Sequence, residues 1–308
     1  MKVTKLILLL FPSFLIAQDL LNQLDKEFPI TPVYEIATFK TTRIGLGHSI
    51  ETRKKGALEI SLYNRFWNHK EGTTQRFLAD EVSTRFGLDY AITNNFTMGV
   101  SYTNFDKITE GYLKYKFLKQ LKKSKKIPLS MVLLQTISHR NKEALQEYDQ
   151  YGVLTSDSNK SSVYSYTLQL LIARKFNTKF SAQFSPIFIT RNHSVFEGQP
   201  KNQFALGFGA RYKVGGHVSF VSEYYKVFNT SKIVTSYNPF MIGVNWELSH
   251  LLLQFQITNV RNYADDTFIT QTKNNFNFHD GNFHFGFNAT FVLHLSKNEM
   301  RSNYKKKQ

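Results

Sequence analysis

The residue types that could activate a water molecule for hydrolysis gather in one segment, residues 261–281. This segment carries Asp265 and Asp266 as an acidic pair, and His279 and Asp280 as a His–Asp pair. A hydrolytic site of this kind needs the two pairs on opposite walls of a cleft, with the water between them. All four residues lie on one expected loop, so the favoured interpretation is a set of solvated loop side chains. We assign no residue a catalytic role, and a hydrolase at the rim is the weakest of three functional hypotheses.

Metal and cofactor chemistry has little support in the sequence. The chain has no cysteine, which excludes disulfide scaffolds, Cys-based zinc sites, iron–sulfur clusters and thiol nucleophiles. His48, His284 and His294 could meet inside a closed fold, but no spacing typical of zinc enzymes relates them. P-loop, dinucleotide-binding and kinase motifs are absent from the sequence as well. We expect neither a metal nor a cofactor.

The elements that must position any functional side chains are β-strands. The 28 Phe, 16 Tyr and 2 Trp give 46 aromatic rings in a chain whose mean hydropathy is −0.33. In residues 282–295, Phe285, Phe287 and Phe291 alternate with polar or small residues, so one strand face is apolar and the other largely polar. The same period of two predicts twelve strands, at 57–67, 82–92, 96–105, 109–118, 128–138, 163–176, 180–189, 203–213, 217–227, 237–248, 251–260 and 282–295.

Two architectures fit this alternation: a soluble sandwich with a shared core, and an outer-membrane barrel with its apolar face in lipid. The connections favour the barrel. Short links at 93–95, 177–179, 215–216 and 249–250 alternate with mostly longer ones, such as 139–162 and 261–281. Outer-membrane barrels have short periplasmic turns and long external loops. We therefore expect an all-β, antiparallel up-and-down transmembrane barrel of about 12 strands, with both termini periplasmic.

The chain divides into four predicted parts. Residues 1–17 have the layout of a secretory signal peptide, with Lys2 and Lys5 before an apolar stretch that ends at Ala17. Cleavage removes two lysines and leaves a formal charge of +16 − 2 = +14. Residues 18–55 form an N-terminal extension that could be a plug or a periplasmic segment. Residues 56–295 form the barrel, and 296–308 form a basic polar tail.

Alternation places a mixed set of polar side chains on the face that would line the lumen. These candidates are Glu59, Arg65, Arg85, Asp89, Glu110, Lys114, Lys116, Arg211, Glu223, Glu247 and His284. An unpaired buried ion is costly, so one interpretation is a paired network that braces a largely closed lumen. The other is a charged constriction that selects small solutes. Both signs occur in similar number, which favours the paired network.

The basic surplus indicates neither a nucleic-acid site nor a specific ligand. Lysines cluster in 119–126 and in 305–307, both expected on the periplasmic side, where anionic lipid headgroups are available. The expected partners are outer-membrane lipid, the barrel-assembly machinery and, if the lumen is open, an unidentified small solute. We expect no nucleic acid among them.

Several stretches resemble an uncharacterised family of bacterial membrane-bound β-barrel proteins. They are TFKTTRIGLGHSIETRKKGALE (38–59), FGLDYAIT (86–93), GYLKYKFL (111–118), LLIARKF (170–176), FALGFGARYK (204–213), SEYY (222–225) and HFGFN (284–288). The resemblance covers nearly all of the mature chain and implies a barrel of the Gram-negative outer membrane. It implies no chemistry. The basic tail 296–308 departs from it, since such barrels commonly end close to the last aromatic strand residue.

Three functions remain open on the sequence alone. The first is an integral outer-membrane β-barrel that acts as a porin-like small-solute channel, a transporter or a binding scaffold. The second is a structural or assembly protein of the outer membrane with a closed lumen. The third is the rim hydrolase.

Overall fold

A computed structural model describes residues 33–67, 79–122, 127–141, 162–196, 198–277 and 283–295. The predicted signal peptide, the tail 296–308, His279, Asp280 and several lysines of both basic clusters lie outside the described residues. Twelve strands and one short helix make up the regular structure of the described part. They are β1 (Ala57–Trp67), β2 (Glu81–Ala91), β3 (Phe96–Thr103), β4 (Ile108–Leu118), β5 (Ser130–Arg140), β6 (Val163–Lys175), β7 (Phe180–Arg191), β8 (Asn202–Lys213), β9 (Val218–Phe228), β10 (Phe240–Leu248), β11 (Leu251–Thr258), α3 (Asp265–Thr270) and β12 (His284–His294).

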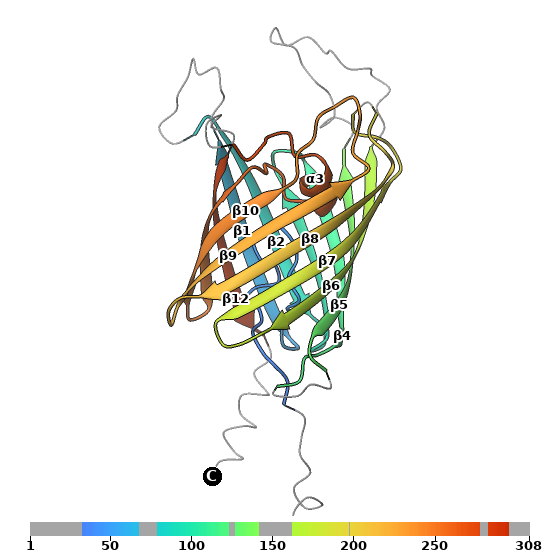
Figure 1. The fold of residues 1–308 in the computed structure, drawn as a ribbon. Coiled ribbons are helices and arrows are strands. Elements are labelled where there is room, and N and C mark those ends of the chain that lie inside the picture. The colour runs from blue at the N-terminus through green and yellow to red at the C-terminus, as the bar shows by residue number, and fades with distance from the viewer. Residues whose placement is uncertain are drawn as a thin grey trace, which may run out of the picture.

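The strands form one closed barrel in which each pairs with its neighbours in sequence (Figure 1). The pairing of β1 with β12 closes the ring, with Ala57 opposite His294 and Phe66 opposite Phe285. This pairing is antiparallel, as it must be when an even number of strands runs up and down. The predicted all-β barrel of about twelve strands is confirmed, and the strand bounds agree to within three residues. No helix of the described part is long and apolar enough to cross a membrane.

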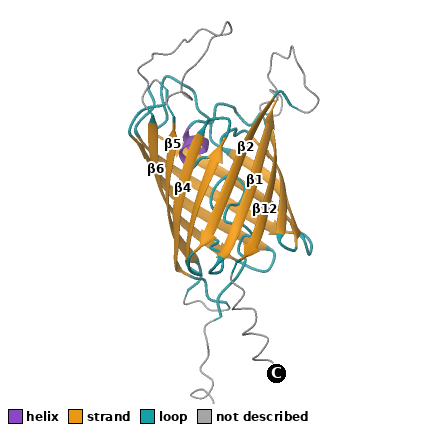
Figure 2. Cartoon of the chain, turned by 180° about the vertical axis from the view of Figure 1, so that it is seen from behind, coloured by secondary structure: helices purple, strands orange, loops and turns teal. Residues whose placement is uncertain are grey.

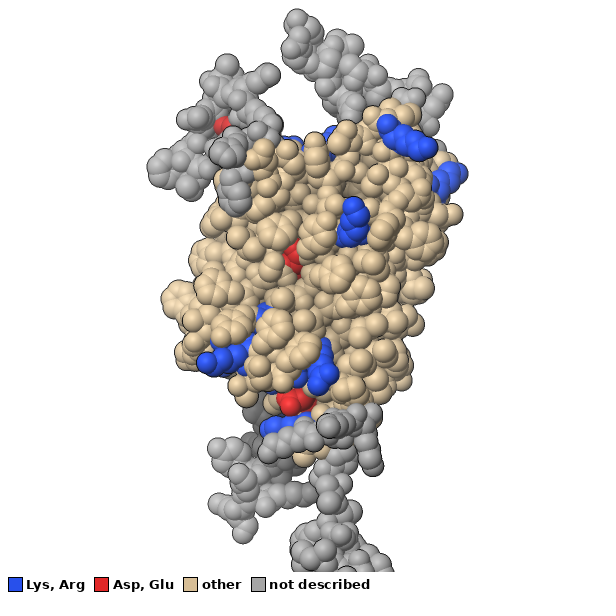
Figure 3. All heavy atoms as spheres, viewed as in Figure 1, with Lys and Arg blue, Asp and Glu red and all other residues tan. Residues whose placement is uncertain are grey.

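Burial alternates along every strand, because successive side chains point into and out of the barrel. On β8, Phe204, Phe208 and Tyr212 point outward and are about half exposed, whereas Gln203 and Arg211 point inward and are buried. The outward set is apolar and rich in rings, as we expect of a surface that faces lipid. Over most of the face in Figure 3 the surface is neither acidic nor basic, and Lys and Arg gather toward its two ends.

The two ends of the barrel differ in their connections. One end, called here the turn end, carries the tight links at 92–95, 176–179, 214–217 and 249–250. The opposite end, called here the loop end, carries the longer connections, including 259–283. The expectation that 261–281 is a solvated loop is wrong for part of this segment. Residues 263–270 are buried, and α3 lies within the ring of strands near the loop end (Figure 2).

Candidate functional site

The N-terminal segment turns back on itself inside the barrel. Residues 39–50, called here the lumen hairpin, are almost all buried, and Arg43 and His48 pair as an isolated antiparallel bridge. The Ile44 amide donates to the Gly47 carbonyl at 2.9 Å, and the Ser49 amide donates to the Thr42 carbonyl at 2.9 Å. These bonds satisfy the hairpin backbone only in part, so the barrel wall must supply the remaining partners.

The structure places all eleven predicted lumen-facing residues inside the barrel. Nine are buried, and Lys116 and Glu247 are partly buried. Seven of the eleven contact residues 40–53: Glu59, Asp89, Glu110, Lys114, Lys116, Glu223 and Glu247. The mixed charge of the lumen wall therefore pairs largely with the N-terminal segment, and not only with itself.

The wall formed by β1, β2 and β4 holds the base of the hairpin. Thr42 Oγ1 lies 2.7 Å from Glu59 Oε1 and 2.7 Å from Asp89 Oδ2. Lys114 Nζ donates to the Thr42 carbonyl at 2.8 Å and to the Ser49 carbonyl at 3.1 Å. A buried ammonium is stable only with such partners, and here it satisfies two backbone acceptors of the hairpin at once.

Glu223 on β9 holds the tip of the hairpin. Its carboxylate accepts the Leu46 amide at 2.6 Å, the Gly47 amide at 3.0 Å and the Tyr225 hydroxyl at 2.7 Å. The two amides are consecutive and point the same way, which makes the tip a small anion-binding nest filled by a side chain of the wall.

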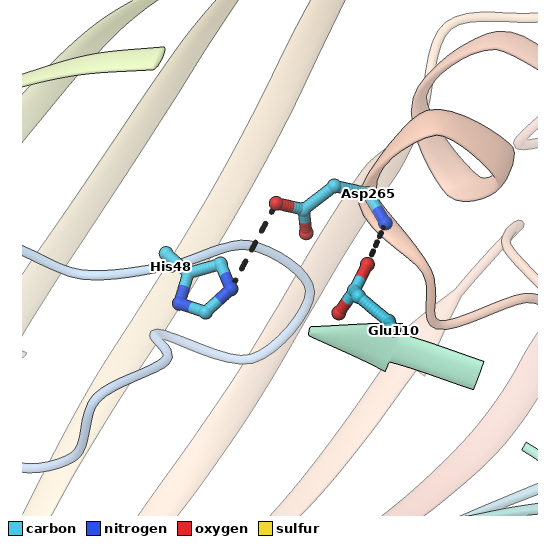
Figure 4. A group of neighbouring side chains, drawn as sticks. All are labelled: His48, Glu110 and Asp265. Carbon is cyan, nitrogen blue, oxygen red and sulfur yellow. Dashed lines mark hydrogen bonds and ion pairs between the residues drawn. The ribbon is translucent and has the colours of Figure 1, made fainter. Parts of the chain in front are cut away.

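Arg43 joins the hairpin to the helix that enters from the other end (Figure 4 shows the two acidic side chains and His48). Its Nη2 lies 2.6 Å from Glu110 Oε1 of β4, and its Nη1 lies 3.3 Å from Asp265 Oδ1 at the start of α3. The Asp265 amide donates to Glu110 Oε2 at 2.7 Å. One guanidinium thus pairs with two carboxylates, one on the wall and one on α3, and all three groups are buried.

His48 lies beside this cluster. Its Nε2 is 3.8 Å from Asp265 Oδ2, and its ring packs edge-on against Tyr112 with the centroids 4.4 Å apart. His48, Glu110 and Asp265 each offer one atom within 4.8 Å of the others, a spacing that a metal ion could bridge. Arg43 already pairs with both carboxylates, however, and its positive charge would repel a cation bound between them. The three histidines considered from the sequence do not meet: His284 bonds Asn274 at 2.9 Å, and His294 is exposed.

The remaining predicted residues brace the wall and the two ends. Arg65 donates to the Asn262 carbonyl and stacks on the Tyr263 ring, 4.0 Å from its centroid. Arg211 pairs with Glu247 at 2.8 Å. Arg85 lies 4.0 Å from Glu110 and over the ring of Tyr63.

An apolar wall faces the charged one. Residues of β5 to β10 form a buried cluster inside the barrel, and the hairpin contributes Phe39, Ile44, Leu46 and Ile50 to it. Phe268 and Ile269 of α3 join the same cluster. The hairpin is therefore held by ionic contacts on one side and by apolar packing on the other.

Two cavities lie at opposite ends of the lumen. The cavity at the loop end has a volume of about 450 Å³ and is bordered by residues 259–262 and 271–274. The one at the turn end has a volume of about 410 Å³ and is bordered by 37–41, 51–54 and 247–252. The hairpin and α3 fill the lumen between them, and their meeting point is the Arg43 cluster.

Residues 39–293 match the model of a family described as "Membrane bound beta barrel domain (DUF5777)". The chain belongs to this family. No curated protein matches it. Solved structures that it resembles include a KdgM porin, at 10% identity over 77% of this chain and 99% of that one, with a TM-score of 0.44. They also include an outer membrane channel from Pseudomonas putida F1 (13% identity, 79% and 98% coverage, TM-score 0.44) and outer membrane phospholipase A from Escherichia coli (13%, 76% and 88%, 0.40).

The DUF5777 family is described as a membrane-bound β-barrel domain, and the geometry of this barrel agrees with that description. A closed antiparallel barrel with an even strand number and a ring-rich, lipid-facing exterior is the architecture of bacterial outer-membrane proteins. The protein is an integral outer-membrane β-barrel.

The sequence indicates a possible plug in 18–55 and an acidic pair at Asp265 and Asp266, but it does not predict that the two meet in this DUF5777 barrel. Arg43 and Asp265 are 222 positions apart, and neither lies on a strand, so alternation could not place them. The Gln169 side-chain amide donates to Asp265 Oδ2 at 2.6 Å, and because Gln169 is uncharged, a search for lumen charges does not include it. One signal was available: Arg43 and His48 lie in a glycine-bearing polar segment that resembles the family. The acidic pair of the rim-hydrolase hypothesis is buried with α3, so it does not form a solvated rim.

Proposed function

We propose that this protein is an outer-membrane barrel whose lumen is closed at rest and which acts as a binding scaffold through its loop end. In the outer membrane the loop end would face outward, and the turn end and both termini would face the periplasm. Residues 1–17 would be removed on export. Lipid surrounds the aromatic face, and the barrel-assembly machinery inserts the chain.

The packing of the lumen hairpin supports this function over an open pore. Four apolar side chains of the hairpin (Phe39, Ile44, Leu46 and Ile50) are at most 2% exposed. Burying each is worth about 1.5–3 kcal/mol, so together they contribute on the order of 6–12 kcal/mol before any ionic contact is counted. A segment held this strongly does not leave the lumen spontaneously often enough to give a steady conductance.

Conductance across planar lipid bilayers tests the proposal. We expect the wild-type barrel to insert without opening, and an Arg43→Gln variant to stay closed as well, because Glu223, Lys114 and the apolar wall still hold the hairpin. Lys179→Gln, a change in an exposed turn, serves as the matched control. Heat-modifiable migration on a detergent gel checks that each variant is folded. Steady openings of the wild-type barrel would overturn the closed lumen.

A gated channel is the second candidate, and one observation favours it. The two elements that close the lumen enter from opposite ends and meet at a single ionic cluster, with a cavity on either side. Loss of Arg43 would then weaken the ionic contacts between the lumen hairpin and α3. Folded Arg43→Gln barrels that conduct, beside a silent wild type and a silent Lys179→Gln variant, would assign the protein to this class.

A further inference from the structure

The cavity at the loop end combines cationic and apolar walls. Arg140, Arg261 and Lys273 line it together with one acidic residue, Asp106. Arg140 lies 3.9 Å from Asp106, and its Nη1 lies 3.3 Å from Gln271 Oε1. Three cations and one carboxylate therefore line the cavity, and Glu81, outside the lining, also interacts with Arg261, so the lining itself carries a net positive charge.

Residues that border the cavity carry polar atoms that are buried without hydrogen-bond partners in the described part of the chain. These atoms include the donors Arg261 Nε and Gln271 Nε2, and the acceptor Asp106 Oδ2. Buried polar groups in native proteins are nearly always hydrogen-bonded, and each exception needs an explanation. Two donors in a lining of net positive charge are features that an anion would satisfy.

The charge states of two of these groups follow from burial. Burial lowers the pKa of the Arg261 guanidinium, while Glu81 and Asp106 act against that shift. Arginine still keeps its charge at neutral pH, because its ordinary pKa is so high. Burial also raises the pKa of the Asp106 carboxyl, while Arg140 acts against that shift.

Part of the cavity lining is apolar. Phe105, Val195, Phe196 and Val234 line it, and Phe105 packs edge-on against Trp67 with the centroids 5.0 Å apart. The volume of about 450 Å³ lies within the range of ordinary small-molecule sites. A compact inorganic ion would leave this apolar side without a partner.

We propose that the loop-end cavity binds a small organic anion, with its acidic group against Arg261 and Gln271 and its apolar part against Phe105 and Phe196. This inference rests on the proposed function, since it names the ligand class of the scaffold. Arg261 sets the preference for an acidic group, and the aromatic side sets the preference for an organic one.

Trp67 gives a direct measurement of binding. It contacts both Phe105 and Arg261, the latter lying 5.2 Å from its ring centroid, and the only other tryptophan is Trp246 on the lipid-facing side of β10. A Trp246→Phe barrel in detergent therefore carries one reporter at the cavity. The probes are benzoate, its neutral isostere benzamide and inorganic phosphate, each titrated against the barrel and against micelles without protein.

We expect saturable binding of benzoate, with weaker binding of benzamide and of phosphate. Arg261→Gln should weaken benzoate by about tenfold or more, as loss of a charge-assisted hydrogen bond implies. Lys273→Gln, at an exposed position, should weaken it by a smaller factor while keeping the fold. Lys179→Gln at the turn end should leave it unchanged.

Three results would overturn the inference. They are no binding of benzoate to a folded barrel, equal binding of benzoate and benzamide, and binding of phosphate in preference to benzoate. The closed lumen is tested by different measurements, because openings in the planar bilayer contradict it and the absence of benzoate binding does not. The two failures are therefore distinguishable.

Discussion

At the tip of the lumen hairpin, two glycines differ in what surrounds them. A Cβ at Gly47 would collide with the Tyr225 hydroxyl, which is bonded to Glu223 and sits on a rigid ring. At Gly45, a Cβ would collide with the terminal methyl of Met241, which is the end of a flexible side chain. Only the first collision acts on a group that cannot move without losing its own hydrogen bond.

This contrast predicts unequal costs for two similar substitutions. Gly47→Ala should lower the free energy of unfolding by about 1–3 kcal/mol, the usual cost of overpacking, because Tyr225 must move away from Glu223. Gly45→Ala should cost less than about 1 kcal/mol, because Met241 can change rotamer. Urea unfolding followed by tryptophan fluorescence measures both. Equal costs would show that the tip is not held against β9 as the structure has it.

The residue scale also shows how far the sequence could predict the site. Glu59, Glu110 and Glu223 were placed on the lumen side because strand side chains alternate, which is a local rule. Their partners are Thr42, Arg43 and the amides of Leu46 and Gly47, and these contacts span 17 to 177 positions. No local rule relates residues so far apart, so the wall could be predicted residue by residue, whereas the N-terminal segment could be given only as a possible plug, without its individual contacts.

Among the elements, the strands and the short helix differ in what determines them. Each strand carries its own period of two, so twelve strands could be predicted to within three residues. α3 has six residues and no side-chain cap at its N-terminus. Helices this short are unstable alone, so tertiary contacts to Glu110 and Ser138 hold α3 in place, and no local pattern of residues predicts these contacts.

The lipid-facing side of a strand predicts a dependence on depth. Phe208 and Tyr212 point outward from β8 and are 48% and 51% exposed, but Phe208 lies mid-strand and Tyr212 lies one residue from the turn end. Phe208→Arg should destabilise the barrel by about 2–4 kcal/mol in a bilayer, and Tyr212→Arg by about 0–1 kcal/mol. Unfolding by urea in lipid vesicles measures the difference. Equal effects would contradict a membrane-spanning position for β8.

For the whole molecule, the lumen is filled from both ends, by a segment preceding β1 and by a segment between β11 and β12. The charged wall satisfies the backbone of the hairpin, and the apolar wall accepts its side chains. A barrel of mixed lumen charge is thus braced by its own chain. This arrangement corresponds to the paired network that the balance of charges favoured, with the hairpin as the larger part of the pairing.

Because the chain has no native cysteine, single cysteines introduced into the intact barrel can be labelled to test whether the lumen is closed. Ile50 in the hairpin is 0% exposed, whereas Ile36, just before the hairpin, is 76% exposed. A cysteine at position 50 reacts with a water-soluble maleimide only when the hairpin leaves the wall. If leaving costs at least about 2.8 kcal/mol, Ile50→Cys should react at least about a hundredfold more slowly than Ile36→Cys. Rates within a few-fold of each other in folded barrels would show that water reaches the hairpin freely, and the lumen would then be open.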